Sequence, residues 1–241
     1  MLKHADDKSM SADERRADIR IPMVDIYETV EGEGTRAGYP TVFIRLYGCN
    51  LRCVWCDTKY SYPPHEAESV MTIGEIMERT KGFKARHVCV TGGEPLMYGE
   101  RSQELLRTLA ESGWYVDIHV ETNGAIPLEP FMSNVKSPLV RYIMDYKLPD
   151  SGENERMIAD NLALLREQDE LKFVIATERD FAEAKRVLSE HAIRATILFS
   201  PVWETMPPAK LVEMMLRDGL SQVKLNLQMH KIIWDPGMRR V

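Results

Sequence analysis

Short apolar segments typical of buried strands alternate with amphipathic segments, and this alternation constrains the fold more than any other feature. Strands are expected at residues 24–30, 41–47, 87–91, 115–120, 141–146, 170–176, 196–200 and 222–227. Helices are expected between 72 and 82 and at 99–112, 153–168, 179–190 and 207–217. Strands that alternate with helices favour a parallel sheet built from βαβ units.

Polar or glycine-rich residues follow the carboxyl ends of at least six of these strands. In a barrel, all such ends converge on one mouth, and this is where α/β proteins keep their chemistry. The helices are too few for eight complete βα units. We therefore predict an α/β fold, a partial (open) TIM-like barrel of parallel strands with outer helices.

The composition fits a soluble globular protein, with 44% hydrophobic and 28% charged residues among 241. We find no linker, repeat or low-complexity segment, so we predict a single domain over residues 21–241. Residues 1–20 are polar and charged, and we interpret them as an N-terminal tail.

The charge and hydropathy patterns exclude several classes of partner. The net charge is −6 and no basic cluster is present, so no nucleic-acid partner is expected. No run of 18 apolar residues suggests a membrane span. The first residues lack the apolar core of a signal peptide, and with four cysteines a cytoplasmic location is the default prediction.

Three cysteines, Cys49, Cys53 and Cys56, lie on the loop predicted to leave the strand at 41–47. Thiolates suit zinc, copper(I) and iron–sulfur clusters. A four-iron cluster normally takes four cysteines, so three would leave one iron open to a small molecule. The alternative is a structural zinc site with a fourth ligand from His65, His87 or Cys89.

The sequence Gly92-Gly93-Glu94-Pro95 directly follows another predicted strand. Glycines let backbone N–H groups approach a ligand closely, and Glu94 is able to accept a hydrogen bond from an ammonium group. A plain glycine turn with a solvated Glu94 is the alternative.

Arg45 stands in the middle of an apolar strand, where it shares a face with Phe43 and Tyr47. A buried arginine needs a partner or a polar cavity. If this face lines the barrel, Arg45 can hold a carboxylate through two hydrogen bonds. A structural ion pair is the alternative.

Further polar residues follow strands or the cysteines. Asp57 and Thr58 offer hard oxygen donors suited to Mg²⁺, or simple turn chemistry. Asp145 and Lys147 share a face at a strand end, where they can bind a ligand or pair with each other. His230 is expected to be a core residue rather than a metal ligand.

The cysteine spacing and residues 92–95 together resemble the radical S-adenosylmethionine superfamily. Within it, the chain resembles the 7-carboxy-7-deazaguanine synthase family at residues 31–34, 39–49, 56–58, 121–124 and 230–234. That family acts in queuosine and 7-deazapurine biosynthesis. It converts 6-carboxy-5,6,7,8-tetrahydropterin to 7-carboxy-7-deazaguanine with loss of ammonia.

The resemblance implies roles for individual residues. Cys49, Cys53 and Cys56 would hold a 4Fe–4S cluster, and Thr58 would ligate Mg²⁺. S-adenosylmethionine would contact Trp55, Cys56, Asp57, Gly93, Asp145, Tyr146, Lys147, Ser200, Pro201, Val202 and Trp203. The pterin would contact Val30, Glu31, Gly32, Arg45 and Thr91. The radical would come from the cofactor, so the resemblance implies no catalytic side chain. Cys89 lies outside these motifs and is predicted to be a buried core thiol.

The resemblance also implies partners, and two alternative functions have to be weighed against it. A flavodoxin-like or ferredoxin-like reductant and a homodimer are expected. One rival is an activase that installs a glycyl radical on another enzyme, and residues 31–34 argue against it. The other is a non-catalytic iron–sulfur electron carrier, and the presence of three loop cysteines rather than four argues against that.

Overall fold

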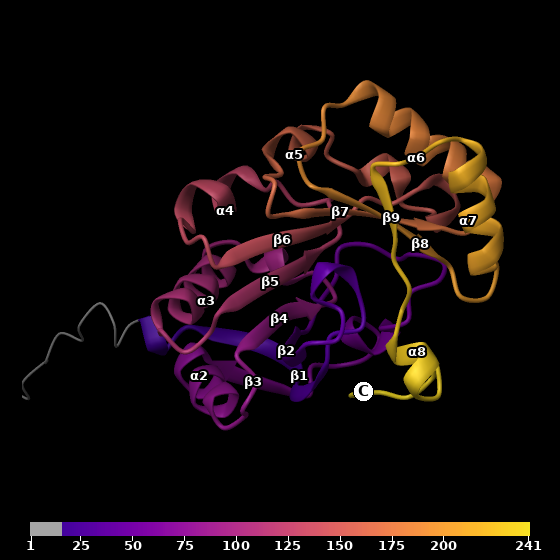
Figure 1. Cartoon of the computed structure of the whole chain (residues 1–241). Coiled ribbons are helices and arrows are strands. Elements are labelled where there is room, and N and C mark those ends of the chain that lie inside the picture. The colour runs from indigo at the N-terminus through magenta and orange to yellow at the C-terminus, as the bar shows by residue number, and fades with distance from the viewer. Residues whose placement is uncertain (1–15) are drawn as a thin grey trace, which may run out of the picture.

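The computed structural model describes residues 16–241, in which one curved sheet of nine strands carries the fold (Figure 1). The strands are β1 (Arg20–Val30), β2 (Pro40–Leu46), β3 (Ser69–Thr72), β4 (His87–Gly92), β5 (Asp117–Thr122), β6 (Val140–Asp145), β7 (Glu170–Ile175), β8 (Thr196–Pro201) and β9 (Val223–Leu225). Their spatial order is β3-β1-β2-β4-β5-β6-β7-β8-β9. The order ends at β3 and β9 without closing, which confirms the prediction of an open barrel.

The strands from β2 to β9, β3 excepted, pair in parallel. By contrast, β1 is antiparallel to both β2 and β3. The carboxyl end of β1 therefore lies beside the start of β2, where Val30 faces Pro40. The sequence predicted β1 but not its direction, and β3 was not predicted at all.

The main helices lie around the outside of the curved sheet, whereas the short α8 lies apart from them near the C-terminus (Figure 1). The helices are α2 (Ile73–Lys81), α3 (Glu100–Glu111), α4 (Glu129–Asn134), α5 (Asp160–Leu164), α6 (Glu178–Glu190), α7 (Pro208–Arg217) and α8 (His230–Ile233). No helix within residues 16–241 is long and apolar enough to cross a membrane.

The hydrophobic core fills the space between the sheet and the outer helices. Alternate strand residues such as Val90, Val120 and Phe173 are buried there, and burial of side chains of this size stabilises the fold by roughly 1.5–3 kcal/mol each. Met206 and Met214 join this core. Because successive strand side chains point to opposite faces, the remaining strand residues line the barrel interior.

A capping box stabilises the start of α2. Thr72 Oγ1 accepts a hydrogen bond from Glu75 N at 3.1 Å, and the Glu75 side chain accepts one from Thr72 N at 2.7 Å. These reciprocal bonds satisfy two backbone donors that a helix start leaves unpaired. Gly82 ends the helix, as expected.

The predicted helix over residues 153–168 is wrong. The chain there forms a 3₁₀ turn at Asn154–Arg156 and the five-residue helix α5. Hydrogen bonds to neighbouring loops replace those of a longer helix. Asn154 Nδ2 donates to Lys147 O at 2.8 Å, and Ile158 N donates to Gly124 O at 3.2 Å. Tertiary contacts thus override the local helical pattern.

Two further segments depart from expectation. Residues 60–69 lie outside every predicted strand and helix, yet Ser61 and Tyr62 are buried. The helix α4 was not predicted. The predicted tail over residues 1–20 lies mostly outside the described residues, and Arg20 already begins β1.

Candidate active site

The loop that follows β2 carries the three cysteines Cys49, Cys53 and Cys56, and all three are free and partly buried. Cys49 Sγ accepts a hydrogen bond from Leu51 N at 3.4 Å. Burial raises the pKa of Cys53 to about 11, although Lys147 acts in the opposite direction. Ligation by iron would therefore have to displace a proton from the Cys53 thiol.

The spread of these sulfurs discriminates between the two metal hypotheses. Among the described residues, only Glu31, Cys89 and His119 form a group of three such ligands with their atoms within 4.8 Å of one another. A tetrahedral zinc ion with Zn–S bonds of about 2.3 Å holds its sulfurs only about 3.8 Å apart. The three loop sulfurs are spread more widely, which fits a multi-iron cluster better than one zinc ion.

The other predicted residues of this loop are Trp55, Asp57 and Thr58, which adjoin Cys56 in the sequence. Trp55 and Thr58 are partly buried, and Asp57 is exposed. Thr58 Oγ1 lies 3.6 Å from Cys56 Sγ, and the carbonyl of Thr58 accepts hydrogen bonds from Ser61. The backbone of Thr58 thus forms a turn, while its hydroxyl faces the cysteine side.

Gly93 lies directly against the cysteine loop. A Cβ atom at Gly93 would come within 2.8 Å of Cys49 Cβ and still closer to the carbonyl of Gly48, so only glycine fits. Glu94 N donates to Gly48 O at 2.7 Å. This close approach joins the loop after β4 to the start of the cysteine loop.

Glu94 is neither a solvated turn residue nor a free acceptor for an ammonium group. Its carboxylate is fully buried and accepts hydrogen bonds from Leu96 N, Thr122 Oγ1 and Asn123 N at 2.7–2.9 Å. Burial raises the pKa of Glu94 to about 7. Asn123 in turn donates to Asn50 Oδ1 at 2.8 Å, so Glu94 ties the ends of β4 and β5 to the cysteine loop.

Asp145 and Lys147 lie at the end of β6, and their charged groups pair at 2.8 Å. Asp145 Oδ1 is buried and has no hydrogen-bond partner among the described residues. A buried acceptor without a partner is costly, so this oxygen suits a donor from a bound ligand. The electrostatic effect of Lys147 on Cys53 places this pair near the cysteine loop.

The other residues predicted to contact S-adenosylmethionine here, Tyr146 and those at the end of β8, differ in whether their side chains reach the site. The Tyr146 ring packs in the hydrophobic core against Phe173, so only its backbone faces the site. The predicted residues at the end of β8 are Ser200, Pro201, Val202 and Trp203. Ser200 Oγ accepts from Asn226 at 2.8 Å, while Trp203 is 43% exposed and available to a ligand.

The barrel interior carries rows of polar and charged side chains that the sequence reading did not identify. These residues are His119 and Glu121 on β5, Arg141 on β6, and Glu170 and Lys172 on β7. They stand at alternate positions of otherwise apolar strands. This period-two pattern of polar residues was the signal that could have revealed them.

Arg45 shares this interior. Within residues 16–241, its side chain makes one hydrogen bond, from Nη2 to the Tyr27 hydroxyl at 3.2 Å, and its neighbour across the sheet is Thr91 on β4. Thr91 Oγ1 donates to Glu121 at 2.8 Å. The guanidinium has no carboxylate at hydrogen-bond distance among the described residues, which disfavours the structural ion pair.

The segment from Glu31 to Arg36 crosses the barrel at the amino-terminal ends of the parallel strands. Arg36 Nε donates to Asp117, which begins β5, at 2.8 Å, and Thr35 N donates to Glu170, which begins β7, at 3.2 Å. The segment thus forms a polar floor under the barrel, opposite the cysteine loop. Of the predicted pterin residues, Val30, Glu31 and Gly32 lie at this floor, and Arg45 and Thr91 lie nearer the mouth.

Glu33 and His230 belong to the floor as well, and neither was predicted there. Burial would raise the pKa of Glu33, but Lys172 at 3.1 Å and a hydrogen bond from Gln228 lower it to about 2. His230 is not a core residue. It lies against Gly32, where an added Cβ would be 2.6 Å from its Nδ1 atom.

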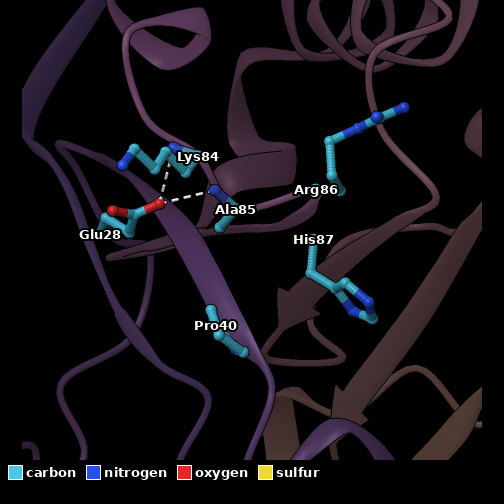
Figure 2. Close-up of a pocket in the computed structure, with 6 residues that line it drawn as sticks. All are labelled: Glu28, Pro40, Lys84, Ala85, Arg86 and His87. Carbon is cyan, nitrogen blue, oxygen red and sulfur yellow. Dashed lines mark hydrogen bonds between the residues drawn. The ribbon is translucent and has the colours of Figure 1, made fainter.

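The concavity in Figure 2 is not this site. Its volume is about 380 Å³, and it is lined by Glu28, Pro40, Lys84, Ala85, Arg86 and His87. Pro40 and His87 begin β2 and β4, so the hollow lies at the end of the sheet away from the cysteine loop. The Glu28 carboxylate already accepts hydrogen bonds from Lys84 N and Ala85 N.

Comparison with known proteins agrees with this geometry. The sequence model of the radical SAM superfamily matches residues 43–151. A 7-carboxy-7-deazaguanine synthase from Clostridium acetobutylicum is 36% identical over 221 residues, covering 91% of this chain and 98% of that protein. One from Chlorobaculum tepidum is 39% identical over 222 residues, covering 90% and 96%.

The chain belongs to the 7-carboxy-7-deazaguanine synthase family. The crystal structure of QueE from Escherichia coli shares the fold, with a TM-score of 0.68 at 22% identity over 89% of this chain and 96% of that one. Membership in a radical SAM family implies a 4Fe–4S cluster and S-adenosylmethionine. The residues present fit both groups: three spread thiols, a glycine cradle beside them and a buried Asp145 oxygen that no other described residue pairs.

Proposed function

We propose that this protein converts 6-carboxy-5,6,7,8-tetrahydropterin to 7-carboxy-7-deazaguanine with loss of ammonia. The observation that carries the proposal is a three-cysteine loop over the mouth of a polar, arginine-bearing barrel, in a chain of this family. The cluster and S-adenosylmethionine supply the radical that starts the ring contraction. The protein supplies placement of the substrate and exclusion of water.

Cys49, Cys53 and Cys56 would hold the cluster. Gly93 would bring backbone groups close to the methionine end of S-adenosylmethionine. Asp145 and Lys147 would bind its nucleoside end, because Asp145 Oδ1 has no hydrogen-bond partner within residues 16–241. The remaining proposed contacts to this cofactor are Trp55, Cys56, Asp57, Tyr146 through its backbone, Ser200, Pro201, Val202 and Trp203.

The pterin would lie between the cysteine loop and the floor. Arg45 would bind its carboxylate, since the guanidinium has unused donors directed into the barrel. Val30, Glu31, Gly32 and Thr91 are the other proposed contacts. Lys172 and Glu121 extend this polar lining, and they would pair with the donors and acceptors along the pterin ring.

We further propose that Mg²⁺ binds with the substrate and that Thr58 supplies one ligand. The pterin carboxylate and the methionine end of the cofactor both bring anionic groups into a partly buried site. Mg²⁺ prefers oxygen ligands and keeps several waters, so one or two protein contacts suffice. The ion would fix the substrate relative to the cofactor, where an error of about 1 Å can cost on the order of a hundredfold in rate.

The test is anaerobic incubation of the reconstituted protein with S-adenosylmethionine, a reductant and the pterin, with detection of the deazaguanine acid by mass spectrometry. A cluster that cleaves the cofactor but yields no deazaguanine would favour an activase. A cluster that only passes electrons would favour a carrier. Adding Mg²⁺ to metal-stripped protein should stimulate wild type strongly and Thr58→Val little; magnesium-independent turnover would remove the ion from the proposal.

The physiological reductant is expected to be flavodoxin-like or ferredoxin-like, because the cluster takes one electron at a time. A homodimer and a cytoplasmic location also stay predictions. Size-exclusion chromatography with light scattering would test the dimer, with a mass twice that of the 27.7 kDa chain expected.

A further inference from the structure

Three residues that differ in chemistry meet inside the barrel, away from the cysteine loop. The ligand atoms of Glu31, Cys89 and His119 lie within 4.8 Å of one another, and all three side chains are buried. Cys89 and His119 are register neighbours on β4 and β5, and Glu31 reaches them from the floor segment. The proposed reaction uses neither Cys89 nor His119, whereas Glu31 is also a proposed pterin contact.

These residues offer one sulfur, one imidazole nitrogen and one carboxylate oxygen. This is a ligand set that zinc accepts in proteins. We propose that Glu31, Cys89 and His119 form a second metal site, which binds one Zn²⁺ ion independently of the cysteine loop.

The surroundings of His119 support this assignment. Its Nδ1 atom lies 2.9 Å from Asp117 Oδ1, and its Nε2 atom points at Glu31 Oε2 at 2.7 Å. Histidine ligands usually donate their other ring nitrogen to a carboxylate, which fixes the ring and its tautomer. Asp117 is itself held by Arg141 Nε at 2.9 Å and Arg36 Nε at 2.8 Å.

The charge of the buried cluster also allows the ion. Without metal, His119 bridges two carboxylates and Cys89 is a thiol. Binding of Zn²⁺ would release one proton from His119 Nε2 and one from Cys89 Sγ to solvent, with no electron transfer. Two positive charges replace two protons, so the net charge of the buried site does not change, and no uncompensated charge is created.

The first experiment removes the other thiol site. In a Cys49→Ala/Cys53→Ala/Cys56→Ala variant, Co²⁺ is added as a spectroscopic probe for zinc. We expect one Co²⁺ per chain with a thiolate-to-cobalt absorption band, and loss of that band when Cys89→Ser is added. Because the site is buried, Co²⁺ is supplied both to the folded protein and during refolding, so that slow access does not hide binding.

Two further variants separate a metal site from a hydrogen-bonded cluster. Asp117→Asn should weaken Co²⁺ binding by about 10- to 100-fold, because it removes the carboxylate that orients His119. His87→Gln is the matched control, since His87 also lies on β4 but outside the three ligands. It should leave the affinity unchanged.

The second experiment uses the intact chain with its cluster in place, so it does not depend on the triple variant folding. After incubation with Zn²⁺ and gel filtration, elemental analysis should find one zinc per chain beside a full complement of iron. Cys89→Ser should lose the zinc and keep the iron. Zn²⁺ should raise the melting temperature of wild type more than that of Cys89→Ser, because an ion that binds only the folded state stabilises it.

The inference is overturned if the triple variant shows no thiolate–cobalt band under either protocol. It is also overturned if the band survives Cys89→Ser, or if zinc in the intact chain does not depend on Cys89. These outcomes are read from cobalt absorption and zinc content rather than from turnover, so failure of the zinc site and failure of the proposed synthase activity are distinguishable.

Discussion

The four cysteines of this chain lie in two different environments, and this predicts different effects of mutation. Cys49, Cys53 and Cys56 are partly exposed on one loop, while Cys89 is fully buried in the barrel wall and burial raises the pKa of its thiol to about 12. Replacement of any one of the three loop cysteines by alanine should abolish the cluster, because the two remaining thiolates would hold it poorly. Cys89→Ala should keep full iron. Iron analysis and visible absorbance after anaerobic reconstitution test this, and loss of iron in Cys89→Ala alone would contradict it.

Arg45 is expected to act through the shape of its guanidinium as well as its charge. Arg45→Lys keeps the charge but loses the planar pair of donors. Its turnover should fall about tenfold or more, since a hydrogen bond to a charged group contributes about 1.5–3 kcal/mol. Arg45→Ala should weaken pterin binding more than cofactor binding, as measured by equilibrium dialysis. Equal losses for both ligands would instead indicate a structural role.

Glu33 and Lys172 form a buried ion pair whose contribution to stability depends on pH. The pKa of Glu33 is lowered to about 2 from an ordinary 4.5, so the carboxylate stabilises the fold fully above pH 4.5. This contribution is lost as the pH falls through about 2. Glu33→Gln should lower the free energy of unfolding by about 3 kcal/mol at neutral pH.

The difference between wild type and Glu33→Gln should shrink as the pH falls below 4.5, as measured by urea denaturation. Glu190→Gln is the matched control. Glu190 pairs with Arg186 on the exposed surface of α6, where a pair contributes only about 0.3–0.5 kcal/mol. A constant difference for Glu33→Gln across this pH range would show that the charge of Glu33 does not stabilise the fold.

The sequence identified the residues that belong to contiguous motifs and missed those brought together by the sheet. The cysteine loop and residues 92–95 could be predicted because each lies in a few consecutive positions. His119 and Glu121 lie on β5, Lys172 lies on β7 and Glu33 follows β1, so only the folded sheet places these residues in one interior. Glu94 was misjudged for the same reason, since its partners Thr122 and Asn123 lie at the end of another strand, β5.

At the scale of elements, Glu94 connects the ends of β4 and β5. Glutamine at this position cannot accept all three of the hydrogen bonds that Glu94 accepts. Glu94→Gln should therefore destabilise the fold by about 2 kcal/mol and weaken S-adenosylmethionine binding, because it loosens the loop that holds Gly93. Urea denaturation and equilibrium dialysis of the reconstituted protein measure the two effects.

Thr72→Ala provides the control for this prediction. It removes a helix cap far from the cysteine loop and should cost about 1 kcal/mol, with no change in cofactor affinity. If both variants weakened the cofactor equally, the effect would reflect general stability rather than the link made by Glu94.

The elements themselves were predicted unevenly, for a physical reason. Most parallel strands are buried on the helix-covered face and therefore carry strong apolar signals, so β2 and β4 to β9 were found within a few residues. β3 is short and half exposed, and its pairing with β1 decides its structure. The segment 153–168 has a helical pattern, but contacts with Gly124 and Lys147 prevent a long helix.

At the scale of the whole molecule, one continuous sheet supports the proposal of a single domain over residues 21–241. Its open barrel places the cysteine loop at the carboxyl ends of the parallel strands and the Glu31–Arg36 segment at the other end. The polar interior of the barrel lies between these two ends, and the chain belongs to the 7-carboxy-7-deazaguanine synthase family. We infer that the barrel interior binds the pterin on which the cluster and its cofactor act.

The most direct test is anaerobic turnover of the reconstituted protein with 6-carboxy-5,6,7,8-tetrahydropterin and less S-adenosylmethionine than pterin. We predict that the assay yields 7-carboxy-7-deazaguanine together with an equal amount of ammonia. We also predict more product than cofactor supplied, because the cofactor is regenerated, and no product from Cys53→Ala. A protein with full iron content that cleaves S-adenosylmethionine but forms no deazaguanine would contradict this inference.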